Sequence, residues 1–329
     1  MKQSDSNVTK LLKMLDADPM LFPFEWDRKA QRVEFVGIRE EEYKNASFLD
    51  ERVIRSNTTR GFVPYEIIRD FTCTSTKPCH FIFHVSHCGS TLLSRLLGVH
   101  PGCFPLREPK VLREFDSQDG SEIQWLFMLL SRTFRPDQNA LIKATSFCSA
   151  FASRWLANLR DSKAVLLTIP LRSFLASVLD GSFVDIESQK RSRWLRLQRM
   201  LVNSDQPLEA LSVGQTAAMS WLCEMLTLEA LAKEFETRCQ TVRFDAILES
   251  PDEVLDSIGQ FLELDPPFPR WSELPTWQEY AKRPGVFYNR DMRSVLLEQA
   301  ERTYQTEIAE GMNWIESIPD PRVSQLPLE

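Results

Sequence analysis

The amino-acid sequence is poor in the features that mark several common protein classes. Its 329 residues include only 11 glycines, and none of its seven cysteines lies in a Cys-x-x-Cys pair. An odd number of scattered cysteines disfavours a disulfide framework or a zinc ribbon, so reduced thiols are the default. The longest apolar runs, such as residues 164–169, are far shorter than the ~20 residues that cross a bilayer. The N-terminal segment lacks the apolar core of a signal peptide. These absences predict a soluble, cytoplasmic protein without a membrane span.

Basic side chains are fewer than acidic ones. The chain has 46 acidic and 39 basic residues and a formal net charge of −7. A net acidic chain is a poor general binder of nucleic acid, and we expect no such partner, although a local basic patch could still bind an anion. The composition is otherwise that of a globular protein, with 43% hydrophobic and 26% charged residues.

Short apolar runs alternate with helical patterns along most of the chain. Strands are predicted at residues 80–85, 140–144 and 163–169, and more weakly at 241–244, with helices over 173–179, 188–201, 215–234 and 251–262. Such alternation favours an α/β fold with a parallel sheet and right-handed crossovers. A polar connector at residues 72–78 suggests two parts. We expect residues 1–76 to form a mixed N-terminal extension that packs on the core, and residues 77–329 to form the main domain with a helical C-terminal part.

The most informative segment is a predicted strand, a polar turn and an immediate helix at residues 81–97. The first amides of a helix lack intrahelical partners and carry the positive end of its dipole. A phosphate could bind there to backbone N–H groups and to hydroxyl groups, with glycine allowing close approach. The residues predicted to take part are His87, Cys88, Gly89, Ser90, Thr91 and Leu92. The alternative is that Ser90 or Thr91 simply caps the helix and binds nothing.

This turn does not have the pattern of a Walker A loop. That motif requires Gly-x-x-x-x-Gly-Lys-Ser/Thr, and the turn here contains no lysine. An NTPase also needs a carboxylate for Mg²⁺ at the end of a neighbouring strand, and the strand at 163–169 is followed by Pro170. Metal-assisted hydrolysis of a nucleoside triphosphate is therefore disfavoured.

The turn resembles the 5′-phosphosulfate loop of sulfotransferases that use 3′-phosphoadenosine 5′-phosphosulfate (PAPS), in the form found in bacterial and tyrosylprotein-type members. Glu108-Pro109 stands where such enzymes often carry a Glu-Pro, and Lys143-Ala144-Thr145 stands where many carry Lys-Thr-His. The segments at residues 168–179 and 242–264 are similar to the family's 3′-phosphate segment and to a segment late in the family's sequences. The resemblance covers roughly residues 80 to 265 and implies a three-layer P-loop fold, with a central parallel sheet flanked by helices.

The resemblance also implies roles for single residues. Glu108 is implied as the general base, while Lys143 and His87 would stabilise charge on the transferred group and the leaving phosphate. The donor would be PAPS, with PAP as product, and the acceptor a hydroxyl or amine of a small molecule or peptide. Further implied donor contacts are Arg172 and Ser177 at the 3′-phosphate and, more loosely, Lys282 and Arg283 in a late basic loop.

The sequence departs from the family pattern at three places. His87 replaces the usual lysine or arginine of the loop, Thr145 replaces the histidine of Lys-Thr-His, and neither Thr168 nor Ile169 is basic where a 3′-phosphate arginine is expected. Two other functions therefore stay open: a non-catalytic nucleotide-binding module and a P-loop kinase that uses ATP and Mg²⁺.

Each candidate residue could instead have a purely structural role. Glu108 could pair with Arg107 or Arg113, and Lys143 could extend its amine from a strand end towards water. His80 and His84 are too far apart along one strand to share a metal ion, and we predict no metal site. An arginine row on the helix at 188–201 favours a solvated face over a lid for an anion. Its members are Arg193, Arg196 and Arg199.

Overall fold

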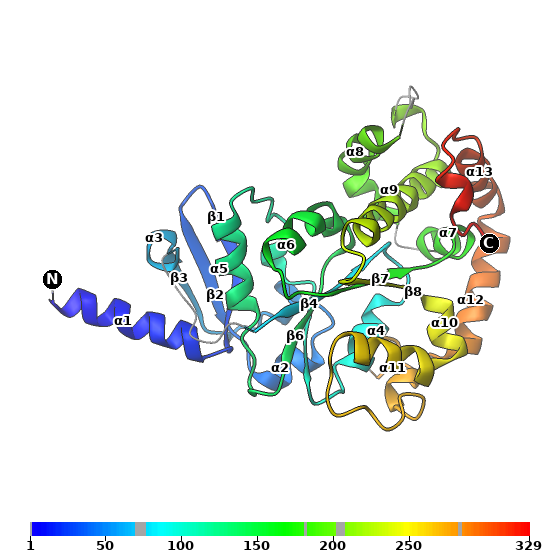
Figure 1. The fold of residues 1–329 in the computed structure, drawn as a ribbon. Coiled ribbons are helices and arrows are strands. Elements are labelled where there is room, and N and C mark those ends of the chain that lie inside the picture. Colours follow the sequence, from blue (N-terminus) through cyan, green and yellow to red (C-terminus); the bar gives the residue numbers. More distant parts are fainter. Residues whose placement is uncertain (1, 70–76, 181–182, 202–207, 282–284) are drawn as a thin grey trace. The chain divides into compact units, whose positions relative to one another are not determined.

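The structure is a computed structural model of the chain that describes residues 2–69, 77–180, 183–201, 208–281 and 285–329 (Figure 1). The chain divides into two compact units. The first contains residues 1–82, 93–164 and 256–269, and the second contains residues 83–92, 165–255 and 270–329. Each unit is described by itself below.

The centre of the fold is a five-stranded parallel sheet, so the predicted α/β class is confirmed. Its strand order is β5-β6-β4-β7-β8. The strands are β4 (Cys79–His84), β5 (Cys103–Arg107), β6 (Asn139–Lys143), β7 (Ala164–Thr168) and β8 (Cys239–Arg243). Every residue of β4, β5 and β7 is buried, as expected for parallel strands covered on both faces. Four of these strands match the predicted ones; β5 was not predicted because it carries Pro105, which an edge strand tolerates.

The first unit begins with structure that the sequence predicted only in part. Helix α1 (Lys2–Ala17) precedes an antiparallel sheet of β1 (Leu21–Asp27), β2 (Arg32–Gly37) and β3 (Arg60–Pro64). Of these strands only β2 was expected, because residues 32–38 have a sequence that could form a strand. The helices that follow along the unit are α2 (Glu40–Asn45), α3 (Tyr65–Ile68), α5 (Gly120–Leu130) and α6 (Ala152–Asn158). The side chain of Asp119 caps α5 by accepting a hydrogen bond from the Ser121 N–H group.

Two buried arginines bind backbone carbonyls of the N-terminal segment. Arg132 donates to the carbonyl oxygens of Leu15 at 2.6 Å and Asp18 at 2.9 Å, and also to that of Leu21. Arg107 donates to the carbonyl oxygens of Lys44 and Ala46 at 3.1 and 2.8 Å. Burial lowers the pKa of Arg107 to about 10, so the guanidinium is still charged at neutral pH.

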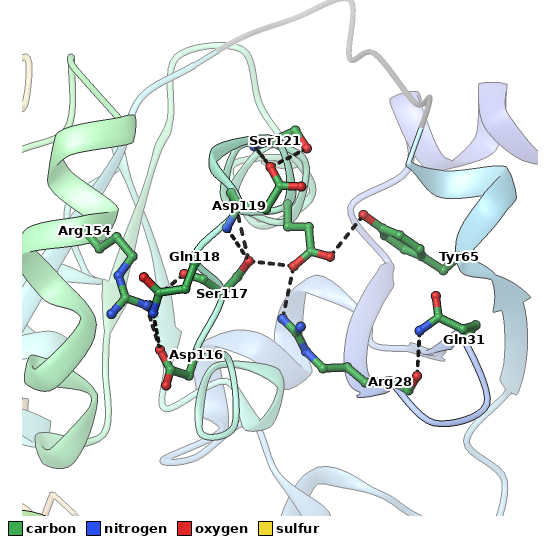
Figure 2. A network of polar contacts seen from close by, with 10 residues as sticks. Arg28, Gln31, Tyr65, Asp116, Ser117, Gln118, Asp119, Ser121 and Arg154 are labelled. Carbon is green, nitrogen blue, oxygen red and sulfur yellow. Dashed lines mark hydrogen bonds and ion pairs between the residues drawn. The ribbon is translucent and has the colours of Figure 1, made fainter.

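A polar network connects the β1–β2 hairpin, α3, α5 and α6 within this unit (Figure 2). Glu122 on α5 accepts hydrogen bonds from Ser117 at 2.5 Å, Arg28 at 3.2 Å and Tyr65 at 3.5 Å. Arg154 on α6 donates to the Asp116 carboxylate at 2.6 Å and to the Ser117 carbonyl at 2.8 Å. The segment at residues 116–119 therefore fixes the start of α5 against its neighbours.

The second unit is mostly helical. Its helices are α7 (Leu171–Leu179), α8 (Phe183–Met200), α9 (Val213–Glu234), α10 (Phe244–Glu249), α12 (Arg290–Thr303) and α13 (Gln305–Glu316). Helices α4 (Ser90–Leu97) and α11 (Pro251–Phe261) have residues in both units. A Cβ atom on Gly214 would lie 1.8 Å from the Glu307 carbonyl oxygen, so α9 and α13 approach as closely as they do only because this residue is glycine. The predicted helices at 173–179, 188–201, 215–234 and 251–262 correspond to α7, α8, α9 and α11.

Two further observations concern the cysteines and the membrane. Six cysteines lie among the described residues, and all six are free thiols. Within that same part of the chain, no helix combines the length and the apolar character needed to cross a bilayer.

Candidate functional site

The turn between β4 and α4 is built from backbone conformations that most residues avoid. Ser86, His87 and Gly89 have φ angles of 75°, 48° and 75°, all in the left-handed region. That region costs a non-glycine residue roughly 1–2 kcal/mol and is concentrated at functional sites. The Ser86 N–H group is held by Nδ1 of His84 at 3.1 Å. The turn therefore brings the strand end directly to the first amides of α4.

Gly89 has two structural reasons to be glycine. Besides its positive φ, a Cβ atom at this position would lie 2.1 Å from the ring of Phe244. The sequence suggested that Gly89 lets the backbone approach an anion, and the structure adds that it lets the turn pack on an aromatic ring. The two roles are compatible because they use different parts of the residue.

The remaining turn residues surround the start of α4. Ser90 and Thr91 are the first two residues of the helix and are buried, and Cys88 is buried beside the Leu167 carbonyl. The first turn of α4 contains no acidic residue, so no carboxylate of its own neutralises the positive end of the helix dipole. The ring of His87 lies edge-on to that of Phe174, with 6.4 Å between the ring centroids.

Glu108 and Lys143 form a second cluster, in the first unit. They lie at the carboxyl ends of β5 and β6, which pair in parallel, and the Glu108 N–H group donates to the Lys143 carbonyl at 2.7 Å. The Lys143 amine forms an ion pair with the Glu108 carboxylate; the two side chains are 1% and 12% exposed. Thr145 donates to the same carboxylate at 3.4 Å. The carboxyl ends of parallel strands are where such sheets bind ligands, so this pair lies at a suitable edge.

Arg113 connects Glu108 to a residue that the sequence did not single out. Its guanidinium lies 3.8 Å from the Glu108 carboxylate and donates to Asp50 at 2.7 Å. Burial alone would raise the pKa of Asp50, but hydrogen bonds from Arg52 and Arg113 lower it to about 2. Asp50 is thus a fixed negative charge at neutral pH. No motif in the sequence links Asp50 with Glu108, because 58 residues separate them and only folding brings them together.

The structural alternative for Glu108, an ion pair with Arg107 or Arg113, is observed in part. Arg113 and Lys143 both approach its carboxylate, whereas Arg107 donates to backbone carbonyls as described above. Glu108 also has a φ of 51°, which a non-glycine residue rarely adopts. The backbone is therefore strained at the residue that the sequence nominated as the base.

The predicted 3′-phosphate residues lie in the second unit and have partners within the chain. Arg172 forms a two-pronged ion pair with Glu329, at 2.6 and 2.9 Å, and this hydrogen bonding raises the pKa of the guanidinium. The Ser177 hydroxyl donates to the Ser173 carbonyl at 2.8 Å within α7. Binding of a phosphate by Arg172 would require this exposed ion pair to open. Lys282 and Arg283 lie outside the described residues.

The arginine row on α8 is not the solvated face that was favoured. Arg193 is 3% exposed and donates to the fully buried Glu224 on α9 at 2.8 Å, and Arg196 donates to the same carboxylate at 2.6 Å. Only Arg199 of the three is exposed. Residues three apart along a helix are offset by about 60°, so the third arginine is carried away from the face of the first.

Comparisons with known proteins complete the description of the site. No protein-family model matches the chain, and no curated protein matches it. Solved structures similar to it include the sulfotransferase domain from the curacin biosynthetic pathway, at 16% identity over 76% of this chain and 98% of that chain, with a TM-score of 0.39. The sulfotransferase from Alicyclobacillus acidocaldarius matches at 14% identity over 74% and 97%, with a TM-score of 0.36. The sulfotransferase domain from the Synechococcus PCC 7002 olefin synthase matches at 18% identity over 75% and 90%, with a TM-score of 0.38. Likenesses of this size neither place the chain in a family nor assign it an activity.

Proposed function

We propose that this protein is a sulfotransferase that takes a sulfuryl group from PAPS and transfers it to a hydroxyl or amine of a small-molecule or peptide acceptor. The observation that carries the proposal is the turn between β4 and α4. It combines left-handed residues, two buried hydroxyl residues and a helix start with no acid in its first turn. Such a turn suits a phosphate group, and the absence of a lysine within it argues against the Walker A alternative.

The residues at the turn fit the donor chemically. The N–H groups from Cys88 to Leu92 and the hydroxyls of Ser90 and Thr91 would hold the 5′-phosphosulfate, with His87 as a further donor. Arg172 and Ser177 would hold the 3′-phosphate together with Lys282 and Arg283. Bound PAPS would supply a sulfuryl group joined to phosphate in a mixed anhydride.

Within this proposal the chain's own residues act by position and fixed charge. Glu108 would accept the proton of the acceptor's hydroxyl or amine, and Lys143 would contribute a buried positive charge beside it. Because the side chains of Thr145 and Arg113 already hold the carboxylate, little reorganisation is required before proton transfer. The transfer itself would be an in-line displacement at sulfur.

The experiment compares PAP, ATP and ATP with Mg²⁺ as ligands in thermal unfolding. A ligand at a hundred times its Kd stabilises the folded protein by about 2.7 kcal/mol, so PAP is expected to raise the unfolding temperature most. PAPS consumption with a panel of acceptors then tests catalysis. A larger shift with ATP and Mg²⁺ would favour a kinase. Binding of PAP without turnover of PAPS on any acceptor would favour a nucleotide-binding module.

A further inference from the structure

His84, the last residue of β4, makes a side-chain contact to the turn that follows it. Its Nδ1 atom accepts a hydrogen bond from the N–H group of Ser86, two residues further along the chain, at 3.1 Å. An imidazole nitrogen accepts a hydrogen bond only when it carries no proton, so the proton of this ring is on Nε2. His84 is 4% exposed, and a hydrogen bond shielded from water in this way is electrostatically stronger than one in solvent.

The contact lies where the chain leaves the sheet and the backbone becomes strained. The Val85 N–H group still pairs with the Leu167 carbonyl of β7, at 3.3 Å. Directly after it, Ser86 and His87 adopt φ angles of 75° and 48°. Residues other than glycine rarely adopt this region, so surrounding contacts must hold the backbone there. The hydrogen bond to His84 restrains the first of these two strained residues.

The geometry of the contact suggests which side chains could replace the histidine. An acceptor on one residue that binds the N–H group two residues later is the arrangement in which asparagine and aspartate side chains stabilise tight turns. In His84 the Nδ1 atom takes the place of the side-chain oxygen of such a residue. Asparagine can therefore reproduce the contact, whereas phenylalanine, a ring of similar size, cannot.

We propose that His84 is a positioning residue for the turn between β4 and α4. By restraining Ser86 and His87 before a ligand arrives, it sets the directions of the amides from Cys88 to Leu92. A turn ordered in advance loses less conformational entropy when it binds a phosphate group. His84 acts through the backbone of Ser86, not by contact with the donor. This inference rests on the proposed function, because it assigns a role to His84 in binding the donor.

Two substitutions of His84 test the proposal through donor affinity. His84→Phe removes the acceptor, and we expect the Kd for PAP to rise roughly five- to tenfold, as for the loss of one net hydrogen bond. His84→Asn retains an acceptor and should recover most of the affinity. In turnover, His84→Phe should raise the KM for PAPS with little change in kcat. An unchanged Kd in His84→Phe, or a loss in His84→Asn as large as in His84→Phe, overturns the proposal.

His100 provides a matched control outside the site. Its Nδ1 atom accepts the N–H group of Gly102, again two residues later, at 3.0 Å, and His100 is 2% exposed. His100→Phe removes the same kind of buried hydrogen bond, so it should lower the unfolding temperature without changing the Kd for PAP. An equal loss of PAP affinity in His100→Phe and His84→Phe overturns the proposal, because the loss then follows from reduced stability.

Hydrogen exchange in the ligand-free protein tests the turn without any donor. Peptides covering residues 85–92 should exchange faster in His84→Phe than in the wild type and His84→Asn, with exchange elsewhere in the chain little changed. Equal exchange in the three proteins overturns the hold of His84 on the turn. Faster exchange in His84→Phe, combined with a wild type that binds neither PAP nor inorganic pyrophosphate, overturns the proposed function instead and leaves that hold established.

Discussion

Glu108 combines a left-handed backbone conformation with an ion pair to the buried Lys143. The carboxylate is oriented by Lys143, Thr145 and Arg113, and each contact comes from a different position along the chain. A side chain with that many partners has little freedom to turn away from an acceptor. Orientation, rather than a mobile approach, is therefore the basis of its proposed role as the base.

Replacing Glu108 by glutamine tests that role. Glu108→Gln keeps the size of the side chain and its ability to accept hydrogen bonds but removes its basicity. We expect kcat for PAPS-dependent transfer to fall by roughly 10²–10⁴, the usual contribution of general acid–base catalysis. The affinity for PAP should hardly change, because the carboxylate is proposed to face the acceptor. Steady-state turnover and PAP titration measure the two quantities.

A control is needed because this substitution leaves Lys143 beside an uncharged partner. Glu263→Gln breaks a lysine–glutamate pair in which the glutamate is 75% exposed, and should preserve turnover. Near-native turnover of Glu108→Gln would exclude Glu108 as the base. Loss of PAP affinity together with turnover would make it a structural residue instead.

Arg113 allows a positioning effect to be separated from a structural one. It contacts both Asp50 and Glu108, whereas Arg52 is a second partner of Asp50. Arg113→Gln should lower kcat roughly tenfold or more with little change in KM, because the carboxylate of Glu108 loses one of its orienting contacts. Arg52→Gln removes an Asp50 partner and serves as the matched control. Equal kcat values for the two variants would contradict a positioning role for Arg113.

At the scale of elements, the parallel strands were the most predictable feature. Almost all residues of β4, β6 and β7 are buried, so these strands appear in the sequence as short continuous apolar runs. The antiparallel strand β3 did not have that pattern. In β3 only Val63 is buried, and Gly61 and Pro64 make the segment look like a loop. Pairing with β2 stabilises β3, and the sequence of β3 alone does not indicate that partner.

The candidate site was predictable to a similar degree. The turn and the two strand-end residues Glu108 and Lys143 follow from local patterns together with the family resemblance, and their roles stay predictions. The ion pair of Glu108 with Lys143 and the pairing of Arg172 with Glu329 did not follow. These contacts join residues 35 and 157 positions apart, and nothing in the local sequence selects one partner among many acids and bases.

For the whole molecule, a falling pH is expected to reduce the stability of the fold first through His80 and only later through Asp50. Burial lowers the pKa of His80 to about 4, well below its ordinary value of 6.5. Between those values the unfolded chain binds a proton that the folded chain does not, so stability falls as pH falls through this range. The pKa of Asp50 is also lowered, from 3.8 to about 2, so its contribution is present above pH 3.8 and is lost only below it.

Denaturant unfolding at pH 7 and pH 4.5 measures the contribution of His80. We expect the wild-type protein to lose about 2 kcal/mol more than His80→Asn over this interval, since the pH falls about two units below the unfolded pKa and 1.36 kcal/mol corresponds to one pKa unit. Asparagine does not titrate and can still accept the Lys163 N–H group that His80 accepts at 3.2 Å. Asp50→Asn should retain the wild-type difference between these two pH values. An equal loss in the wild type and His80→Asn would contradict the assignment.

The carbonyl contacts of Arg132 limit how the chain can be divided. Three of its acceptors come from residues 15–21, and the guanidinium that they surround is 8% exposed. A shortened chain that starts after β1 would keep the cation and lose these acceptors, and a buried charge without compensation costs several kcal/mol. Loss of a few kcal/mol matters to a protein whose net stability is itself only about 5–15 kcal/mol. The carbonyl groups of the N-terminal segment thus solvate an interior charge in place of water, so this segment is not an independent module.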